Sequence, residues 1–218
     1  MDWQLFLNPY EQTVNELKLK LREMRKQYRQ TDNHAPIEFV TGRIKSVDSI
    51  KEKMVRRQLT EDRLDEMEDI AGVRIMCQFV EDIYQVVSDL RKRKDMTIIE
   101  ERDYITNNKS SGYRSYHIVI NYPLQQIDGE KIIKAEIQIR TLAMNFWATI
   151  EHSLNYKYQG KFPDEIEARL RRAAEAAFQL DTEMSSINGD IKEAQQIFSQ
   201  KKGYTDSSLD DIDNKIEV

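Results

Sequence analysis

The sequence predicts a mixed α/β fold, in which a mixed β-sheet is flanked by helices, with long helices at both ends of the chain. Two observations predict it: strand-like apolar runs alternate with amphipathic helical patterns in the middle, and helical spacing dominates both ends. We expect a single domain over residues 1–202, with helical arms around a core at about 36–160. Residues 203–218 hold five acidic residues and one lysine, a net charge of −4, and are expected to be disordered.

The N-terminal part contains two expected helices. The first, at about residues 10–30, carries apolar residues at helical spacing, and these are Val14, Leu17, Leu21, Met24 and Tyr28. A second stripe on it is basic and consists of Lys18, Arg22, Arg25 and Arg29. Such a stripe is typical of a solvated face, although four cations without an intervening acid also suit an anion site. Past Gly42 the chain is expected to enter another helix, which Ser46 or Asp48 would cap.

The middle of the chain supplies the strands. We expect a buried strand at about 73–79, a helix in "EDIYQVVSDLRKR" and a strand in "MTIIEERDYI". "SSGYRSYHIVINY" predicts a strand that Pro123 ends, and "KIIKAEIQIRT" predicts another. "LAMNFWATIEHSLNYKY" predicts a long helix, and residues 163–202 predict further helix. On the long helix, the side chains expected on the buried face are Leu142, Phe146, Ile150 and Leu154.

Composition excludes several classes of protein. One cysteine, Cys77, excludes an internal disulfide, and with three histidines a structural zinc site is not expected. There is no phosphate-binding P-loop, no dinucleotide-binding glycine motif and no nucleophile elbow. The N-terminus lacks a signal-peptide pattern, and no apolar run is long enough to span a bilayer. We therefore expect a cytoplasmic protein with no membrane partner.

The strand that begins near Tyr113 carries an unusual set of polar side chains. Strand alternation places Tyr113, Ser115 and His117 on one side, and in "AEIQIR" it places Glu136 and Gln138 on the corresponding side. A solvent-exposed hairpin face would also be polar, and the motif alone leaves this alternative open. A tyrosine, a histidine, a glutamate and a glutamine together nevertheless supply a stacking plane, proton-transfer groups and an amide.

Asp69 and Glu136 are candidate ligands of a divalent cation. Asp69 directly precedes the buried strand, and two carboxylates with phosphate oxygens and waters make an ordinary magnesium site. Asp69 has three acidic neighbours in "DEMEDI", so it could also serve only as a cap or a solvated charge. Basic residues that could meet a polyphosphate are Arg43, Lys45, Lys53, Arg56 and Arg74. Cations beside two carboxylates favour phosphoryl transfer.

Six motifs in order resemble the synthetase domain of the RelA/SpoT homologues. They are "GRIKSVDSIKEKM", "DIAGVRIMCQF", "ERDYI", "SGYRSYH", "AEIQIRT" and "FWATIEHSLNYKY". The resemblance covers about residues 1–200 and is strongest to the stand-alone small alarmone synthetases of the RelQ type. It implies a nucleotidyltransferase-like sheet. It also implies a GTP pyrophosphokinase that transfers the β,γ-diphosphate of ATP to the 3′-hydroxyl of GDP or GTP, giving ppGpp or pppGpp and AMP.

The resemblance also implies roles for individual residues. Asp69 and Glu136 resemble the Mg²⁺ ligands, and Glu136 also resembles the group that takes the proton from the 3′-hydroxyl. The residues implied in ATP binding are Arg43 and Arg74, which would clamp adenine, and Ser46, Lys53 and Arg56, which would contact phosphates. The residues implied in GDP or GTP binding are Tyr113, which would stack on guanine, and Lys109, His117 and Gln138.

Regulation and assembly follow from the same resemblance. RelQ-type relatives are homotetramers with an effector site for the product alarmone between subunits. The residues that match this site's pattern are Lys18, Arg22, Arg25, Phe39, Thr41 and Asn145. No His-Asp pair of a metal-dependent hydrolase occurs, so no hydrolase activity is expected.

Two other functions remain open from the sequence. One is a single-stranded RNA-binding module, alone or in addition to catalysis, because basic stripes with interspersed tyrosines can hold a phosphate backbone. The other is a nucleotidyltransferase that attacks the α-phosphate of its nucleotide.

Overall fold

The computed structural model describes residues 1–31, 34–158 and 162–213 and contains a five-stranded mixed sheet. Its strands are β1 (Phe39–Ile44), β2 (Ala71–Cys77), β3 (Thr97–Asp103), β4 (Tyr116–Gln126) and β5 (Gly129–Thr141). They are ordered β1-β2-β5-β4-β3. Only the central β2–β5 pair is parallel, and the other three pairs are antiparallel. The predicted mixed α/β fold is confirmed.

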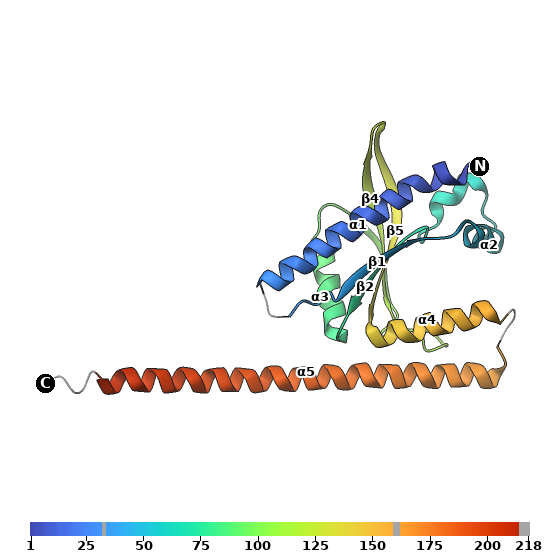
Figure 1. Cartoon of the computed structure of the whole chain (residues 1–218). Coiled ribbons are helices and arrows are strands. Elements are labelled where there is room, and N and C mark those ends of the chain that lie inside the picture. Colours follow the sequence, from blue (N-terminus) through green and yellow to red (C-terminus); the bar gives the residue numbers. More distant parts are fainter. Residues whose placement is uncertain (32–33, 159–161, 214–218) are drawn as a thin grey trace.

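Helices cover both faces of this sheet. They are α1 (Trp3–Thr31), α2 (Val47–Arg57), the 3₁₀ helix η1 (Glu61–Glu66), α3 (Val80–Arg91), α4 (Leu142–Lys157) and α5 (Asp164–Asp213). Helices α1 and α3 lie on one face of the sheet. Helix α4 packs against one end of the sheet, and the long α5 runs beneath α4 (Figure 1). The fold therefore has two unlike faces.

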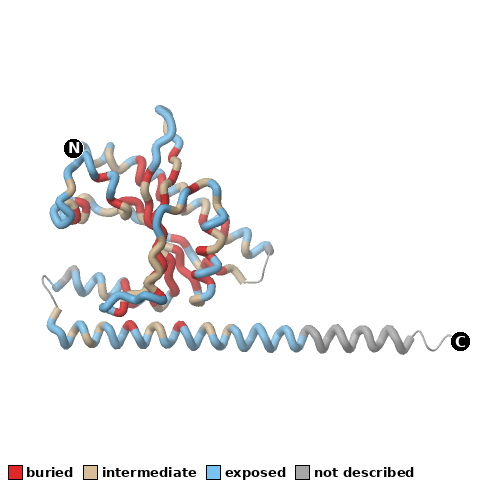
Figure 2. The backbone as a smooth tube through the Cα atoms, turned by 180° about the vertical axis from the view of Figure 1, so that it is seen from behind, coloured by how far each residue is buried: buried red, intermediate tan, exposed pale blue. Residues whose placement is uncertain are grey.

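Alternation along β2 and β5 makes one face apolar. Val73 and Ile75 on β2 and Ile137 and Ile139 on β5 are fully buried in a core that α1 and α3 cover. In Figure 2 the buried segments concentrate at the centre of the sheet, while most of α5 is exposed. The residues that alternate with these apolar residues along β2 and β5, such as Arg74 and Gln138, point to the side of α4, so the second face of the sheet is polar.

Helix α1 packs closely on β1 because Gly42 has no side chain. A Cβ atom at Gly42 would lie 2.5 Å from Val14 Cγ1 and 2.7 Å from Lys18 Cδ. The helix begins at Trp3, earlier than the expected residue 10, because Asp2 Oδ1 accepts hydrogen bonds from the N–H groups of Gln4 and Leu5. The segment before α2 was expected to lead directly into that helix, but it forms strand β1. As predicted, Ser46 caps α2.

Strand β4 corrects a further expectation. Pro123 does not end the strand, which continues to Gln126 and pairs Pro123 with Ile132 of β5. Strand β3 pairs with β4 only as far as Asn121. From Pro123 onward β4 is therefore an edge strand, where a proline is tolerated.

Helix α4 is turned differently from the prediction. Met144, Trp147 and Ala148 are buried, whereas the four residues expected to be buried are 40–69% exposed, namely Leu142, Phe146, Ile150 and Leu154. The reason is that α4 carries two apolar stripes, and the sheet and α5 pack against the one that contains Trp147. The prediction of the buried face was wrong.

Helix α5 also extends beyond its expected end. It continues to Asp213, so residues 203–213 of the expected disordered tail are helical, and residues 214–218 lie outside the described residues. No proline occurs between 164 and 213 to stop the helix. Within the described part of the chain, no helix is both long enough and apolar enough to cross a membrane.

Candidate active site

The polar face of the sheet gathers side chains from three elements around Glu136. Glu136 is 8% exposed on β5, and His117 is 7% exposed on the neighbouring β4. His117 Nδ1 lies 2.8 Å from Glu136 Oε1, and Gln138 Nε2 donates to Glu136 Oε2 at 2.7 Å. The predicted convergence of His117, Glu136 and Gln138 is confirmed, and both oxygens of the carboxylate are engaged.

The environment keeps Glu136 ionised. Burial alone would raise the pKa of Glu136, but the hydrogen bonds from His117 and Gln138, together with the positive charge that His117 carries when it is protonated, outweigh it. The pKa of Glu136 consequently lies below its ordinary value. A buried, ionised carboxylate with two hydrogen bonds is suited to accept a proton or to hold a cation.

Tyr113 reaches this cluster from the loop that precedes β4. Its hydroxyl lies 2.7 Å from His117 Nε2 and accepts a hydrogen bond of 2.6 Å from Arg140 Nη2. Lys109 Nζ lies 5.0 Å from the centre of the Tyr113 ring and 4.6 Å from that of Tyr104. Ser115, which shares the predicted face, is fully buried and donates to the carbonyl oxygen of Ile139.

Helix α5 supports the same loop from below. Gly112 has a φ of 88°, and a Cβ atom there would lie 2.6 Å from Ala174 Cβ of α5. Arg114 stacks on Phe178 at 4.0 Å and pairs with Glu175, both on α5. Only glycine combines this backbone conformation with this close approach. Helix α5 therefore holds the loop that carries Lys109 and Tyr113.

Asp69 lies on the side of Glu136 that is opposite to Tyr113, between two lysines. Lys45 Nζ donates to Asp69 Oδ2 at 2.9 Å, and Lys53 Nζ donates to Asp69 Oδ1 at 2.7 Å. Burial opposes ionisation of Asp69, but these two ion pairs outweigh it and hold its pKa below the ordinary value. Asp69 is thus neither a helix cap nor a freely solvated charge.

Three arginines face one another across the site. Arg74 interacts electrostatically with both Arg140 and Arg43, and burial together with repulsion from these two arginines lowers the pKa of Arg74. Arg74 Nε donates to Gln138 Oε1 at 3.2 Å. Such a concentration of positive charge attracts a polyanion. Two further predicted ATP contacts lie on or before α2: Ser46 serves as its N-cap, and the exposed Arg56 is in its last turn.

Some of these residues line a cleft of about 480 Å³ on the polar face. Its lining includes all three arginines, Lys109, Tyr113 and Gln138. A smaller pocket contains both Asp69 and Glu136 and shares Arg43, Arg74 and Gln138 with the cleft, so the two are continuous.

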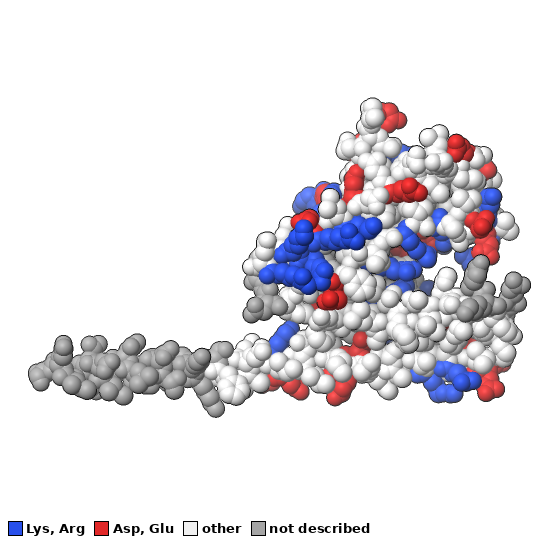
Figure 3. Space-filling view, in the orientation of Figure 1, with Lys and Arg blue, Asp and Glu red and all other residues white. Residues whose placement is uncertain are grey.

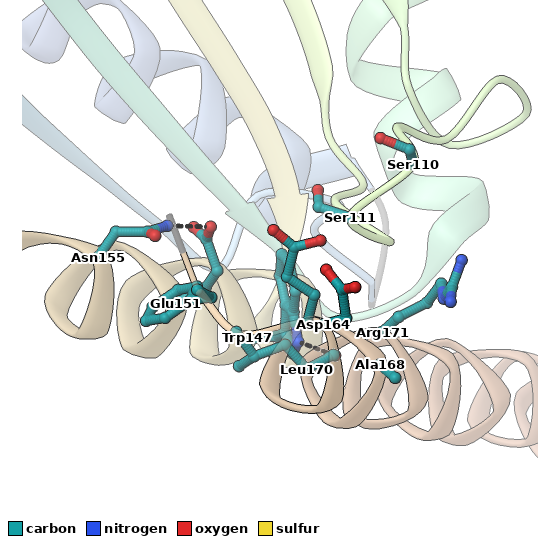
Figure 4. A pocket seen from close by; sticks show the side chains of 11 residues that line it. Ser110, Ser111, Trp147, Glu151, Asn155, Asp164, Ala168, Leu170 and Arg171 are labelled. Carbon is teal, nitrogen blue, oxygen red and sulfur yellow. Dashed lines mark hydrogen bonds between the residues drawn. The ribbon is translucent and has the colours of Figure 1, made fainter. Parts of the chain in front are cut away.

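A second cavity, of about 440 Å³, adjoins the cleft and shares Ser111 and Glu151 with it. It lies between α4, α5 and the loop, and Trp147 Nε1 donates to the Leu170 carbonyl oxygen at its base (Figure 4). Acidic residues predominate here, in contrast to the cleft: Glu151, Asp164 and Glu167 outnumber Arg171.

Comparison with known proteins places the chain in a family. The model described as "Region found in RelA / SpoT proteins" matches residues 42–161. Over 200 residues the chain is 58% identical to GTP pyrophosphokinase YjbM of Bacillus subtilis (strain 168), covering 92% of this chain and 95% of that protein. The chain belongs to the RelA/SpoT family. The family resemblance of the six sequence motifs is confirmed.

Solved structures of RelA/SpoT relatives share the fold. Small alarmone synthetase 1 from Bacillus subtilis, crystallised with its product pppGpp, matches with a TM-score of 0.84 and 58% identity, over 87% of this chain and 97% of that chain. A GTP pyrophosphokinase family protein from Streptococcus pneumoniae matches with a TM-score of 0.84 and 63% identity, over 89% and 97%. These relatives give no support to an RNA-binding module or to attack at the α-phosphate.

The donor set fits a divalent cation of the kind that phosphoryl transfer requires. Asp69 and Glu136 line one small pocket, and their oxygens are hard ligands. No group of three or more His, Cys, Asp or Glu side chains forms a metal site among the residues described. A cation would consequently complete its coordination with nucleotide phosphates and waters.

The residues predicted for an effector site lie around the edge strand β1. Lys18, Arg22 and Arg25 belong to α1, over whose C-terminal half basic side chains gather (Figure 3). Phe39 and Thr41 alternate with Val40 and Gly42, which face α1, so they point to the opposite side of the sheet. Asn145 lies on α4 and accepts a hydrogen bond from Arg140 Nη1. Within one chain, the six residues of the predicted effector site therefore lie on two different faces of the sheet.

Arg140, Glu151 and His152 are among the residues that line the cleft without having been predicted as site residues. Strand alternation from Glu136 and Gln138 puts Arg140 on the same face, but nothing in the sequence indicates its hydrogen bonds to Tyr113 and Gln138. His152 is exposed and lines the cleft with Glu151. Only the helical spacing from Trp147 and Ala148 could have indicated that His152 and Glu151 face the cleft.

Proposed function

We propose that this chain is a GTP pyrophosphokinase. It transfers the β,γ-diphosphate of ATP to the 3′-hydroxyl of GDP or GTP, so that AMP leaves and ppGpp or pppGpp forms. The observation that carries the proposal is a cleft that joins a buried, ionised Glu136 to three arginines. The 58% identity to a GTP pyrophosphokinase over most of the chain supports the same reaction.

Glu136 supplies the base in this mechanism. A ribose hydroxyl is a poor nucleophile, so the site must align it with the β-phosphorus and remove its proton. The Glu136 carboxylate accepts that proton as the oxygen attacks the β-phosphorus, and the bond from this phosphorus to the α,β-bridging oxygen breaks. The hydrogen bonds from His117 and Gln138 hold the carboxylate in place while this happens.

The basic residues bind the donor nucleotide. Arg43 and Arg74 clamp the adenine ring, because planar guanidinium groups stack well on aromatic rings. Lys53 and Arg56 contact the phosphates, and Ser46 adds a hydroxyl at the start of α2. These assignments rest on the family resemblance, and the repulsion among Arg43, Arg74 and Arg140 supports a polyanionic ligand.

The loop below β4 binds the acceptor nucleotide. The Tyr113 ring stacks on guanine, and Lys109 neutralises phosphate charge beside it. Gln138 and His117 line the same side. The position of Lys109 over two tyrosine rings supports a preformed aromatic and cationic platform.

Asp69 and Glu136 would hold Mg²⁺ together with the phosphates of ATP. Bound there, the ion neutralises the charge that develops on the transferred diphosphate. Lys45 and Lys53 occupy the oxygens of Asp69, which supports a site whose carboxylate is already ionised and oriented.

We further propose a cytoplasmic homotetramer regulated by its product alarmone. Apolar side chains that are 40–52% exposed follow a 4-3-4 spacing along α5, and these are Leu180, Met184, Ile187 and Ile191. Together with the exposed stripe of α4, they support contacts between copies of the chain. The separation of Asn145 from the basic stripe of α1 supports an effector site to which two subunits contribute.

Radiolabelled nucleotide tests the reaction. The protein is incubated with γ-labelled ATP, magnesium and GDP, and the products are separated by chromatography. We expect label on the guanine nucleotide and stoichiometric AMP. Labelled free pyrophosphate would instead indicate attack at the α-phosphate. Salt-sensitive RNA binding without turnover would contradict the proposal and leave the RNA-binding module.

A further inference from the structure

Arg140 is a buried arginine without a carboxylate partner. It is 5% exposed, and no carboxylate in the described ranges lies within ion-pair distance of it. Its guanidinium instead donates to four neutral acceptors, which are Ser115 Oγ, Asn145 Oδ1, Tyr113 Oη and Gln138 Oε1. Burying a charge against neutral groups alone is costly, so a structural role explains Arg140 poorly.

Two hydrogen-bond paths run from Arg140 to Glu136. Along the first, Arg140 Nη2 contacts Tyr113 Oη at 2.6 Å, and Tyr113 Oη lies 2.7 Å from His117 Nε2. His117 Nδ1 then lies 2.8 Å from Glu136 Oε1. Along the second, Arg140 Nη2 donates to Gln138 Oε1 at 3.0 Å, and Gln138 Nε2 donates to Glu136 Oε2 at 2.7 Å. Both hydrogen-bond paths therefore start at Arg140 Nη2, and each ends at a different oxygen of the Glu136 carboxylate.

We propose that Arg140 and the hydroxyl of Tyr113 are positioning residues that orient the Glu136 carboxylate through His117 and Gln138. The proposal rests on the proposed function, in which Glu136 is the base. In this proposal Tyr113 has two separate roles. The Tyr113 ring binds the acceptor nucleotide, and the Tyr113 hydroxyl orients Glu136, which deprotonates the 3′-hydroxyl of that nucleotide.

The chemistry of the end groups fixes the direction of every hydrogen bond. A guanidinium only donates and a carboxylate only accepts. With a neutral imidazole, His117 carries its proton on Nδ1 and donates to Glu136, so Nε2 accepts from the Tyr113 hydroxyl. The Tyr113 oxygen in turn accepts from Arg140. The same reasoning fixes Gln138, because its oxygen must face Arg140 and Arg74, which leaves its NH₂ group toward Glu136.

Nitrogen NMR tests these directions without any turnover. The chain has only three histidines, so ¹⁵N-histidine labelling and a His117→Gln variant assign the signals. At a pH high enough to keep the imidazole neutral, we expect a protonated Nδ1 and an unprotonated Nε2 shifted by an accepted hydrogen bond. Tyr113→Phe should move the Nε2 shift toward that of a nitrogen without a hydrogen bond and leave Nδ1 protonated. Arg140→Met should move it in the same direction by less, and Arg140→Lys should recover part of the change.

Kinetics then separates the two roles of Tyr113. Tyr113→Phe keeps the ring, so the KM for GDP should change less than about threefold, while kcat should fall about tenfold because one hydrogen bond is lost. Tyr104→Phe is the matched control for the NMR experiment. Its ring lies edge-on to His117 at 5.2 Å, but its hydroxyl is outside both paths, so the Nε2 shift should stay at the wild-type value.

Three outcomes would overturn the proposal. A proton on Nε2 in the wild-type chain would reverse the first path. An Nε2 shift that Tyr113→Phe leaves unchanged would exclude the hydroxyl as its partner. Loss of the hydrogen bond with an unchanged kcat would exclude a role in positioning. Absence of pyrophosphokinase activity in the wild-type chain would instead refute the proposed function, and the NMR result would still decide whether the hydrogen-bond paths exist.

Discussion

The two faces of the sheet use the same strands for opposite purposes. On β5, Ile137 and Ile139 are sealed against α1 and α3, whereas Glu136, Gln138 and Arg140 form hydrogen bonds around a cleft. The apolar face derives its stability from close packing, in which even Gly42 is needed for space. The polar face consists of charged groups that would be costly without partners or ligand. Stability and chemistry are thereby assigned to alternate residues of one strand.

The largest effect is expected from Glu136→Gln on the polar face. The amide cannot accept a proton, so synthesis of the alarmone should fall about a thousandfold or more while the fold persists. Initial rates with saturating ATP and GDP, and the circular dichroism spectrum, measure the two properties. Glu130→Gln is the matched control, because Glu130 lies exposed at the other end of β5, where its carboxylate accepts a hydrogen bond from Gln125. Near-wild-type synthesis by Glu136→Gln would refute the mechanism.

The apolar face should respond in the opposite way to Leu17→Ala. Leu17 of α1 is fully buried, so its truncation leaves a cavity and should lower the free energy of unfolding by about 3 kcal/mol. Leu19→Ala on the same helix is the control, because Leu19 is 61% exposed and its loss should cost less than about 0.5 kcal/mol. Urea unfolding at a fixed protein concentration measures both, since an oligomer's stability depends on concentration. Equal losses would contradict the assignment of α1 to the core.

Strand alternation made much of this division predictable from the sequence. A period of two gives the face of every residue once one apolar face is recognised, so Glu136, His117 and Gln138 could be brought together without coordinates. Placing Asp69 beside Glu136 requires knowledge that β2 pairs with β5 in parallel, and the sequence alone does not specify this pairing. The individual roles in the site came from the family resemblance.

The errors have a common physical cause. Helix α4 has apolar residues on two sides, and spacing alone cannot show which side meets the sheet, so Leu142 and Phe146 were placed in the core although they are exposed. Strand β1 escaped prediction because it is an edge strand of six residues with Gly42 at its centre. Arg140 was missed as a site residue because its importance lies in contacts with a loop residue distant in sequence, Tyr113.

A buried acid on α5, next to the C-terminal end of β5, should affect stability in a pH-dependent way. Burial raises the pKa of Asp181 on α5 to about 6, although a hydrogen bond from Thr141 opposes this. The folded state therefore binds a proton more tightly than the unfolded state, whose aspartate titrates near 3.8. Stability from this group is full below the unfolded pKa and is lost as the pH rises through about 6.

Asp181→Asn should abolish that loss, because the amide oxygen still accepts from Thr141 and cannot ionise. Relative to the wild-type chain, the variant should gain about 2–3 kcal/mol between a pH of about 4 and about 7. Urea midpoints at both pH values measure the difference, with Asp190→Asn on the exposed part of α5 as control. A constant difference across this range would show that Asp181 does not titrate there.

The smallest expected effect is on the KM for GDP in Tyr113→Ala, whereas loss of the hydroxyl that orients Glu136 should lower kcat in this variant as it does in Tyr113→Phe. The platform for the acceptor base is lost, and base stacking on an aromatic ring contributes about 1–3 kcal/mol, so the KM for GDP should rise about tenfold. The KM for ATP should change less than about twofold, because Arg43 and Arg74 lie on the sheet and keep their positions. Steady-state kinetics with each nucleotide varied separately gives both values. Tyr84→Ala removes a tyrosine from α3, on the apolar side of the sheet, and should alter neither KM. A parallel rise in both KM values for Tyr113→Ala would mean that the donor and acceptor sides are not independent, and that the loop held by α5 shapes the whole cleft.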